Sequence, residues 1–238
     1  MMSQMPAIGW YGKLPSAGDF LRRRFPDALY NAWIHWFQLG LLDWQQSEEQ
    51  RPDSGRQFAS APVWNFVVPP LLGSRLVQMG CLLPARDSVG RQYPVCALLS
   101  YSLTQWSPQR LARAGEWYQQ LGRTLLQGVR NGCSAEQLDG ALLAIPAPPE
   151  PKDHDASGIL QAIGYDDDQQ DTLGWRQAAD CFSPQQYTSF WWTNRTDGYP
   201  LYTHLHSGNF TSQLFNMLFD PAAGAKPGRN GLYPPMFE

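Results

Sequence analysis

The spacing of apolar residues in the 238-residue chain predicts a first long element, a helix over residues 27–44. Apolar side chains recur there at three- and four-residue steps: Leu29, Trp33, Trp36, Phe37 and Leu41. Pro26 and Asp27 supply a typical helix start. Apolar residues also fill much of the opposite side, so the helix either lies in the centre of the core or keeps one face for a partner. The pattern favours the central core helix.

Three short runs rich in β-branched and aromatic residues predict strands over residues 63–68, 75–83 and 93–101. Turns bearing Pro and Gly separate these runs. A parallel pair of strands needs a crossover of about a dozen residues or more, so connections this short predict antiparallel neighbours.

The next segment predicts two helices with clear boundaries. The Ser-Pro pair at 107–108 suits a helix start, and the Asn-Gly pair at 131–132 suits the end of that helix. The Ser-Ala-Glu-Gln sequence at 134–137 is a capping-box pattern. It predicts a further short helix that ends before Pro146.

The last third of the chain contains a Pro-rich polar stretch at 146–157, predicted strands at 188–193 and 201–205, and a final helix around 210–218. The residues after Pro221 are rich in Gly and Pro.

These elements predict an α/β (α+β) fold in which a largely antiparallel mixed sheet has helices packed on both faces. We expect one domain over residues 1–221 and an irregular tail over residues 222–238.

The overall composition narrows the class of protein. Only 16% of the residues are charged, 13% are aromatic, and the net charge is −3. A chain of this kind can bury a large apolar core, so it is not disordered. It also lacks the basic surplus that a nucleic-acid partner requires.

The four cysteines are spread singly, without a Cys-x-x-Cys pair, as is typical of buried thiols in a reducing compartment. The N-terminus has no secretion signal, and no apolar run reaches the roughly 18 residues that span a bilayer. We expect a cytoplasmic protein that does not insert into a membrane.

The first stretch with candidate chemistry, residues 9–20, contains three glycines together with Lys13 and Asp19. Part of it is similar to a phosphate-binding loop, but its glycine spacing is too short and no hydroxyl residue follows the Lys. A strand that passes into a tight turn explains the glycines instead. Three arginines at 22–24 follow, and they either hold an anion or an acidic partner, or form a solvated face.

The second such stretch, residues 80–94, joins two predicted strands through a turn that carries Asp87 and Arg91. We expect the Asp87 carboxylate to accept hydrogen bonds from backbone amides while Arg91 closes an ion pair. A catalytic role would pair Asp87 with Asp19 as acid and base. Nothing in the spacing brings the two carboxylates together and no His accompanies them, so structural ion pairing is the favoured interpretation.

No common catalytic motif occurs in the chain. His204 and His206 share a face of a predicted strand and could hold a metal, but no third ligand accompanies them, so we predict no metal and no cofactor. The surplus of Trp and Tyr is candidate material for a binding surface. Trp191 and Trp192 must face opposite sides of their strand, and a sheet covered on both faces would explain both as core residues.

Residues 9–20 read Gly-Trp-Tyr-Gly-Lys-Leu-Pro-Ser-Ala-Gly-Asp-Phe, and residues 61–66 read Ala-Pro-Val-Trp-Asn-Phe. Residues 80–94 end in Asp-Ser-Val-Gly-Arg-Gln-Tyr-Pro. Ser-Phe-Trp-Trp at 189–192 and Gly-Tyr-Pro at 198–200 follow. In this order, the motifs resemble the TagF (ImpM) family of accessory proteins of bacterial type VI secretion.

The resemblance implies a non-enzymatic, cytoplasmic regulator that represses type VI secretion after translation by binding the forkhead-associated (Fha) protein of the system. We place the partner contacts on the first two motifs, at Trp10, Tyr11, Lys13, Asp19, Arg22, Arg23, Asp87 and Arg91. The alternative is a small-anion or phosphate sensor, or a hydrolase, that uses the loops of Lys13, Asp19 and Arg91.

Overall fold

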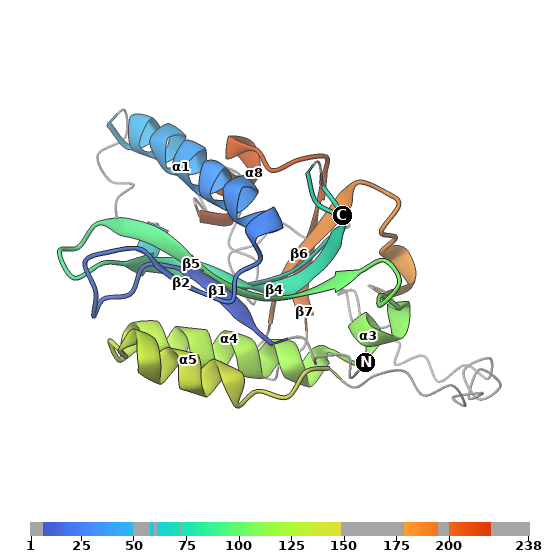
Figure 1. Cartoon of the computed structure of the whole chain (residues 1–238). Helices are drawn as coiled ribbons and strands as arrows, with labels where there is room; N and C mark the ends of the chain where they lie inside the picture. Colours follow the sequence, from blue (N-terminus) through green and yellow to red (C-terminus); the bar gives the residue numbers. More distant parts are fainter. Residues whose placement is uncertain are drawn as a thin grey trace.

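At the centre of the fold, the described residues form a seven-stranded antiparallel sheet, shown in the computed structural model of Figure 1. The structure describes residues 7–49, 58–59, 61–71, 73–148, 179–194 and 200–219. The strands are β1 (Gly9–Gly12), β2 (Leu21–Arg23), β3 (Trp64–Val68), β4 (Leu76–Arg86), β5 (Gln92–Ser102), β6 (Thr188–Asn194) and β7 (Pro200–Ser207). Their order across the sheet is β2-β1-β5-β4-β3-β6-β7.

The predicted antiparallel pairing of the three early strands is confirmed, because β3 pairs with β4 and β4 pairs with β5. The β4–β5 hairpin is longer than predicted and stays in register as far as Arg86 opposite Gln92. Pro84 and Pro94 lie opposite each other within it. An antiparallel ladder accepts such a pair where facing residues exchange no hydrogen bonds, so Pro84 does not end its strand.

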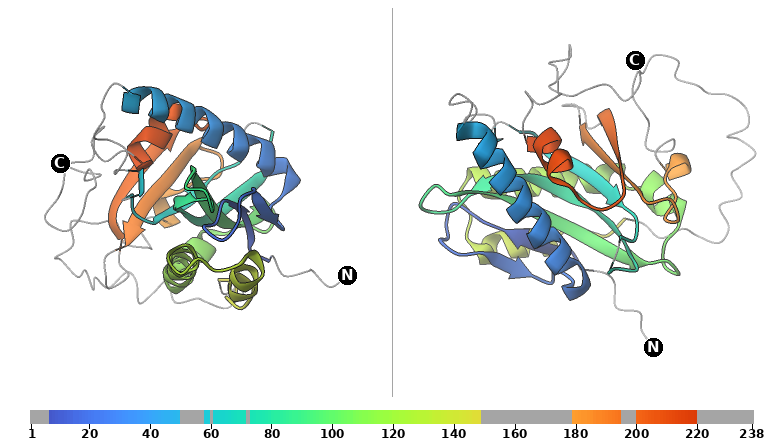
Figure 2. Two further views of the ribbon diagram at one scale, coloured as in Figure 1. Left: turned by 90° about the vertical axis from the view of Figure 1, so that its left-hand side faces the viewer. Right: turned by 90° about the horizontal axis from the view of Figure 1, so that it is seen from above.

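Helices cover both faces of the sheet, which confirms the predicted fold class (Figures 1 and 2). One face carries α1 (Asp27–Glu49) and α8 (Ser212–Phe219). The other carries α4 (Gly115–Arg130) and α5 (Ala135–Leu143), and the short α3 (Pro108–Ala112) leads into α4.

Local sequence explains how these helices begin. The predicted capping box at α5 is present: the Ser134 side chain accepts from the Gln137 amide, and the Gln137 side chain accepts from the Ser134 amide. The single helix predicted after Ser107 is wrong, because the chain breaks into α3 and α4 around Ala114. Gly115 is the first residue of α4, and glycine is a poor helix former that favours such a break.

The sheet separates two buried layers of different composition. We call the side chains between the sheet and α1 and α8 the aromatic layer; its rings include Tyr11, Phe25, Trp33, Trp36, Phe37, Trp44, Phe58, Trp64, Phe66, Tyr93, Trp191, Phe215 and Phe219. We call those between the sheet and α4 and α5 the aliphatic layer, which is built mainly from Val67, Val77, Met79, Leu83, Val95, Leu99, Leu121, Leu125, Leu138 and Leu142.

The aromatic layer is joined by hydrogen bonds from indole N–H groups. Trp33 Nε1 donates to Gln78 Oε1 at 2.7 Å, and Trp36 Nε1 donates to the Thr211 carbonyl at 2.8 Å. Trp64 Nε1 donates to the Leu218 carbonyl and Trp191 Nε1 to Ser189 Oγ, both at 2.8 Å. These bonds connect α1 with the sheet and with the segment at α8.

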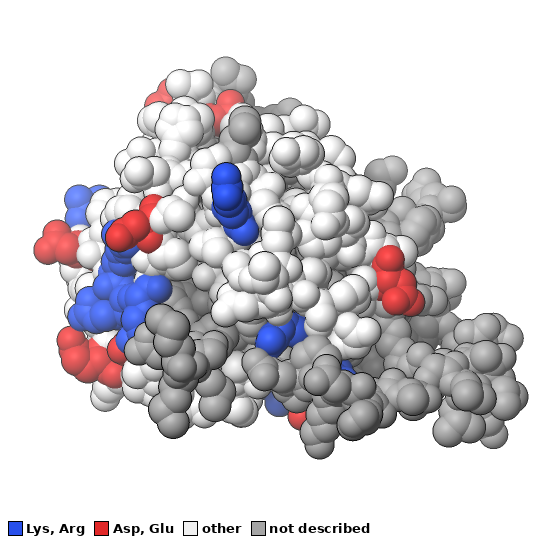
Figure 3. Space-filling model, turned by 45° about the vertical axis from the view of Figure 1, so that its right-hand side comes forward, with Lys and Arg blue, Asp and Glu red and all other residues white. Residues whose placement is uncertain are grey.

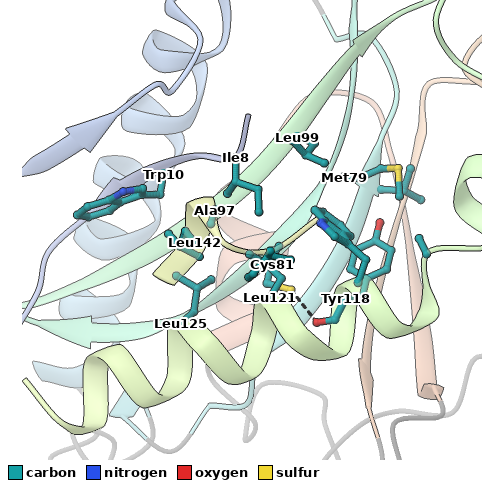
Figure 4. Close-up of a cluster of buried hydrophobic side chains, with 14 of the residues drawn as sticks. Ile8, Trp10, Met79, Cys81, Ala97, Leu99, Tyr118, Leu121, Leu125 and Leu142 are labelled. Carbon is teal, nitrogen blue, oxygen red and sulfur yellow. Dashed lines mark hydrogen bonds between the residues drawn. The ribbon is translucent and has the colours of Figure 1, made fainter. Parts of the chain in front are cut away.

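The aliphatic layer packs α4 against the middle of the sheet, as Figure 4 shows for Leu121 and Leu125 facing Cys81 and Ala97. Cys81 lies 3.1 Å from Asn65 Oδ1 and 3.7 Å from the Tyr118 carbonyl. The predicted apolar stripe of this helical segment is therefore buried as expected, although the segment consists of two helices.

The prediction that α1 is a central core helix is wrong. α1 lies on the outside of the aromatic layer and buries only one side (Figure 2). Leu39 and Leu42 on its outer side are 47% and 55% exposed. Trp33, Trp36 and Phe37 alone supply enough apolar surface to hold the helix on the sheet.

The predicted tail at 222–238 and most of the Pro-rich stretch at 146–157 lie outside the described residues. The domain boundaries therefore stay predictions. In the part of the chain that is described, we find no helix with the length and apolar character needed to cross a membrane.

Candidate partner-binding surface

Two loops that are far apart in the sequence meet at one end of the sheet. The first, residues 13–20, leaves β1 at Gly12, whose φ of +147° and close approach to Val95 exclude a side chain. The second, residues 86–92, is the β4–β5 turn. The Ser88 amide donates to the Ala17 carbonyl at 2.9 Å, so the backbones of the two loops are directly bonded.

The Asp87 carboxylate is the centre of this contact. Its Oδ2 accepts from Lys13 Nζ at 2.7 Å and from Arg91 Nε at 2.6 Å. Its Oδ1 accepts from the amides of Val89 and Arg91 at 3.1 and 2.8 Å. The predicted amide capping and Arg91 ion pair are confirmed, and Lys13 adds a third charge. We call these three side chains the loop lock.

Within the loop lock, the buried charges of Lys13 and Asp87 offset each other, and Arg91 adds a positive charge that is largely exposed. Burial alone would raise the pKa of Asp87, but the hydrogen bonds from Lys13, Arg91 and the two amides hold that pKa well below its ordinary value. The carboxylate is therefore ionised at neutral pH and fully bonded, so it is not available as a general acid or base. Asp19 is exposed and takes no part in these bonds.

Lys13 and Asp87 were predicted partner contacts, and the structure corrects this because both side chains are buried. Arg91 differs from them. Its guanidinium binds Asp87 and the Gly18 carbonyl, at 3.0 Å, yet 65% of its side chain is exposed. Arg91 therefore both ties the loops together and presents a cation at the surface.

The joined loops also expose two apolar side chains. Phe20 is 51% exposed and Val89 is 72% exposed. Phe20 is held in place by the Tyr93 ring, with centroids 4.7 Å apart, and by Lys13 Nζ, 4.6 Å from its own centroid. A rigid apolar side chain that remains half exposed is suited to contact with another protein.

The three arginines at 22–24 are largely used within the fold. Arg22 donates to the Phe25 carbonyl, pairs with Asp27 and lies over the Tyr30 ring, so it holds the start of α1. Arg23 is only loosely paired with Glu136, at 3.8 Å, and keeps 40% of its side chain exposed.

Arg24 binds Asp139 of α5 through its two terminal nitrogens. Nη1 donates to Oδ2 at 2.9 Å, and Nη2 donates to Oδ1 at 2.5 Å. These bonds attach the chain just after the end of β2 to α5. Arg23 also donates to the Arg22 carbonyl at 2.9 Å, but its side chain is the most exposed of the three arginines. It remains a candidate for partner contact.

Trp10 and Tyr11 were predicted partner contacts and are instead core residues, one on each side of β1. Trp10 Nε1 donates to Asp139 Oδ1 at 2.7 Å. The Tyr11 and Tyr93 hydroxyls lie 2.8 Å apart, and burial raises the pKa of Tyr11 to about 12. Sequence alone shows that successive strand residues point to opposite faces, but not that both faces are covered.

Trp191 and Trp192 also point to opposite faces of their strand, β6. Trp191 lies in the aromatic layer and Trp192 in the aliphatic layer, so the interpretation of both as core residues is confirmed.

The two candidate metal ligands on β7 do not form a metal site in the described structure. His206 Nε2 is 2.8 Å from the Asn209 carbonyl. Burial, together with the neighbouring His206, lowers the pKa of His204 to about 4. Among the described residues, no group of three His, Cys, Asp or Glu side chains is placed to hold a metal ion.

The sequence analysis missed Phe20 and Val89. Val89 is an apolar residue inside a turn of otherwise polar and glycine residues, and that isolation is the signal that could have found it. Phe20 has no such signal, because its loop contains other apolar residues and Leu21 follows it.

Asp19, Phe20, Val89 and Arg91 lie on the two bonded loops, and we call these four residues the loop surface. Arg23 lies on the α5 side of β2 and is a separate candidate.

A sequence model described as the TagF N-terminal domain, type VI secretion system-associated, matches residues 9–145. Among solved structures, the chain is similar to PA0076 from Pseudomonas aeruginosa PAO1, with 19% identity and a TM-score of 0.64. The similarity covers 90% of this chain and 94% of that chain, and it shows a shared fold. No curated protein matches the chain.

Proposed function

The chain belongs to the TagF family of proteins associated with type VI secretion, and from this premise we propose that it represses secretion after translation by binding the system's forkhead-associated protein. The binding site is the loop surface. We also place the protein in the cytoplasm, where isolated thiols such as Cys81 and Cys96 remain reduced.

The observation that supports this proposal is the rigid exposure of apolar and cationic side chains on two bonded loops. The loop lock leaves these loops little freedom, so holding them for a partner costs little further entropy. Phe20 and Val89 supply apolar contact area, and Arg91 supplies donors for a carboxylate on the partner.

A non-enzymatic role agrees with the state of the titratable groups in the loop lock and in the buried strands β4 and β5. Catalysis requires an acid, base or nucleophile that is free to exchange a proton or form a bond. Asp87 is held ionised by Lys13 and Arg91, and the thiols of Cys81 and Cys96 have their pKa raised by burial.

The alternative of an anion sensor or hydrolase receives no support from Lys13. Its ammonium group is buried and already bonded to Asp87, so an incoming anion would have to displace an internal carboxylate.

The test is a binding titration of the purified protein with the purified forkhead-associated protein. Val89→Asp and Phe20→Ser are expected to weaken binding by about tenfold or more, because each removes apolar contact from the centre of the loop surface.

Leu103→Asp is the matched control. Leu103 is also a half-exposed apolar residue, but it follows the far end of β5, about 35 Å along the strand from Gln92. Equal binding by the wild type and by folded Val89→Asp and Phe20→Ser proteins would remove the loop surface from the interface. Failure of the wild type to bind the scaffold would refute the proposed partner.

A further inference from the structure

An open hollow of about 620 Å³ lies beside the loop surface, at the end of the sheet where the β4–β5 hairpin passes the C-terminus of α4. Its walls are Pro15, Phe58, Ala59, Pro84, Ala85, Arg86, Gly90, Gln92, Val129, Arg130, Asn131 and Gly132. The bond from Ser16 Oγ to the Cys133 carbonyl, at 2.7 Å, holds the first loop against the turn after α4. The hollow is therefore bounded by segments that are fixed to one another.

The lining of the hollow includes apolar residues and backbone that side chains do not cover. Pro15 and Val129 are half-buried and Ala59 is exposed, so these three provide the accessible apolar area. Gly90 and Gly132 have positive φ values, and a Cβ placed on either would meet nothing within 4 Å. An extended chain could therefore approach these glycines closely.

Two exposed guanidinium groups, those of Arg86 and Arg130, line the same hollow. Neither takes part in the ion pairs found between described residues, whereas Lys13, Arg22, Arg23, Arg24 and Arg91 all do. The protein as a whole is acidic, with a net charge of −3, so two cations with no ion-pair partner among the described residues form a local positive site in this hollow.

We propose that this hollow binds an acidic, extended segment of the protein partner, with a partner carboxylate held between Arg86 and Arg130. The planar guanidinium fork suits a carboxylate, because it can donate two parallel hydrogen bonds. Apolar side chains of the same segment pack on Pro15 and Val129. The inference rests on the proposed function in one respect, namely that the segment belongs to the scaffold bound at the loop surface.

The direct test uses a fluorescein-labelled peptide, acetyl-Glu-Pro-Glu-Leu-Glu-Pro-Glu-amide, and fluorescence polarisation at low ionic strength. The double variant Arg86→Gln/Arg130→Gln is expected to bind it about tenfold more weakly than the wild type, and the Gln counterpart of the peptide is expected not to bind. Both arginines are exposed, so the double variant should keep its urea midpoint, which confirms that it is folded.

Arg123→Gln is the matched control. Arg123 is an exposed arginine of α4, two turns before Arg130, and it does not line the hollow. This variant should bind the peptide as tightly as the wild type. Peptide binding that is the same for the double variant and the wild type, or that falls equally in the Arg123→Gln control, would overturn the proposal.

The same proteins are then titrated with the forkhead-associated protein. Weaker scaffold binding by the double variant, with Arg123→Gln unaffected, supports both proposals. Scaffold binding that needs Phe20 and Val89 but not Arg86 and Arg130 overturns the hollow and leaves the proposed function standing. Arginine-dependent peptide binding without any scaffold binding supports the hollow as an acidic-peptide site and refutes the scaffold as its source.

Discussion

The two faces of the sheet hold their helices in different ways. In the aromatic layer, indole N–H groups of Trp33, Trp36, Trp64 and Trp191 all reach acceptors on other segments or within the sheet. On the opposite face, Trp10 Nε1 donates to Asp139 and the Tyr118 hydroxyl donates to the Phe66 carbonyl, whereas the buried indole nitrogens of Trp106 and Trp117 reach no acceptor within the described ranges. The face of the molecule in Figure 3 has its largest group of Lys, Arg, Asp and Glu residues at the left-hand side, and much of the rest of that face is uncharged.

The comparison distinguishes two contributions to the stability of the fold, namely apolar burial and buried hydrogen bonds. Apolar burial stabilises both faces and has no direction. Hydrogen bonds inside an apolar layer are directional, and an acceptor left without its donor there is costly, so they specify one arrangement of α1 and α8. The aliphatic layer contains fewer indole hydrogen bonds, of which Trp10 makes one, and it is built mainly by close packing of Leu and Val side chains.

The largest effect is expected from Trp33→Ala. It removes the ring that packs on Trp36, Phe37 and Phe66 and leaves the Gln78 side chain without its donor. We expect a loss of about 4 kcal/mol in the free energy of unfolding, measured by urea denaturation. Gln38→Ala, on the exposed side of α1, should change it by less than about 0.5 kcal/mol, and equal losses would contradict the burial of one side only.

Leu125→Ala tests the aliphatic layer in the same assay. Leu125 is fully buried beneath the sheet, and its truncation creates a cavity without removing a hydrogen bond (Figure 4). The expected loss is about 3 kcal/mol. A loss below about 2 kcal/mol, the lower end of the range for buried Leu→Ala substitutions, would mean that α4 is loosely packed against the sheet.

A pair of Trp→Phe substitutions isolates the hydrogen bonds. Trp33→Phe keeps most of the ring but removes the donor to Gln78, and it should cost about 2 kcal/mol. Trp117→Phe removes a buried N–H that has no acceptor in the described structure, and it should cost less than about 1 kcal/mol. Equal costs for the two substitutions would show that indole hydrogen bonds do not distinguish the faces.

Acid is expected to act on the two faces in separate pH ranges. His204 lies opposite Trp191, on the side of the aromatic layer, and burial lowers its pKa to about 4. The folded state therefore disfavours the protonated ring, so stability falls as the pH drops from about 6.5 to about 4, and His204→Gln should abolish this loss.

Asp139 acts at lower pH, on the α5 side. The hydrogen bond from Arg24, assisted by Trp10, lowers its pKa against the effect of burial. The ionised form is favoured in the fold, so its contribution is present at neutral pH and is lost as the pH falls below about 4. We expect the free energy of unfolding, measured by urea denaturation at several pH values in this range, to depend less steeply on pH for Asp139→Asn than for the wild type. An equal dependence on pH would show that the Arg24 bond does not stabilise α5.

Much of the fold could be predicted from sequence because its signals are local. The capping box at Ser134 and the short turns between strands depend on neighbouring residues. The outward side of α1 could not be predicted, because a helix with apolar residues on most sides fits two positions in a fold. Its Leu39 and Leu42 are exposed only because α8 covers a different part of the helix.

In the candidate site, too, the contacts within one turn could be predicted and the contacts between distant segments could not. Asp87 and Arg91 are four residues apart, so their bonds follow from the chemistry of one turn. Lys13 joins them from 74 residues away, and that contact depends on β1 lying beside β5. The burial of Trp10 and Tyr11 likewise depends on layers formed by distant segments, which no local pattern reveals.

The pairing of β3 with β6 determines the order in which the molecule can be completed. Asn65 lies opposite Trp192, so this part of the sheet closes only after most of the chain has been synthesised. Until then α1 lacks Trp191 and α8, and part of its ring-rich side remains uncovered. We expect a fragment that stops at residue 145, where the family match ends, to keep that side open and to aggregate, because the aromatic layer includes residues beyond the match.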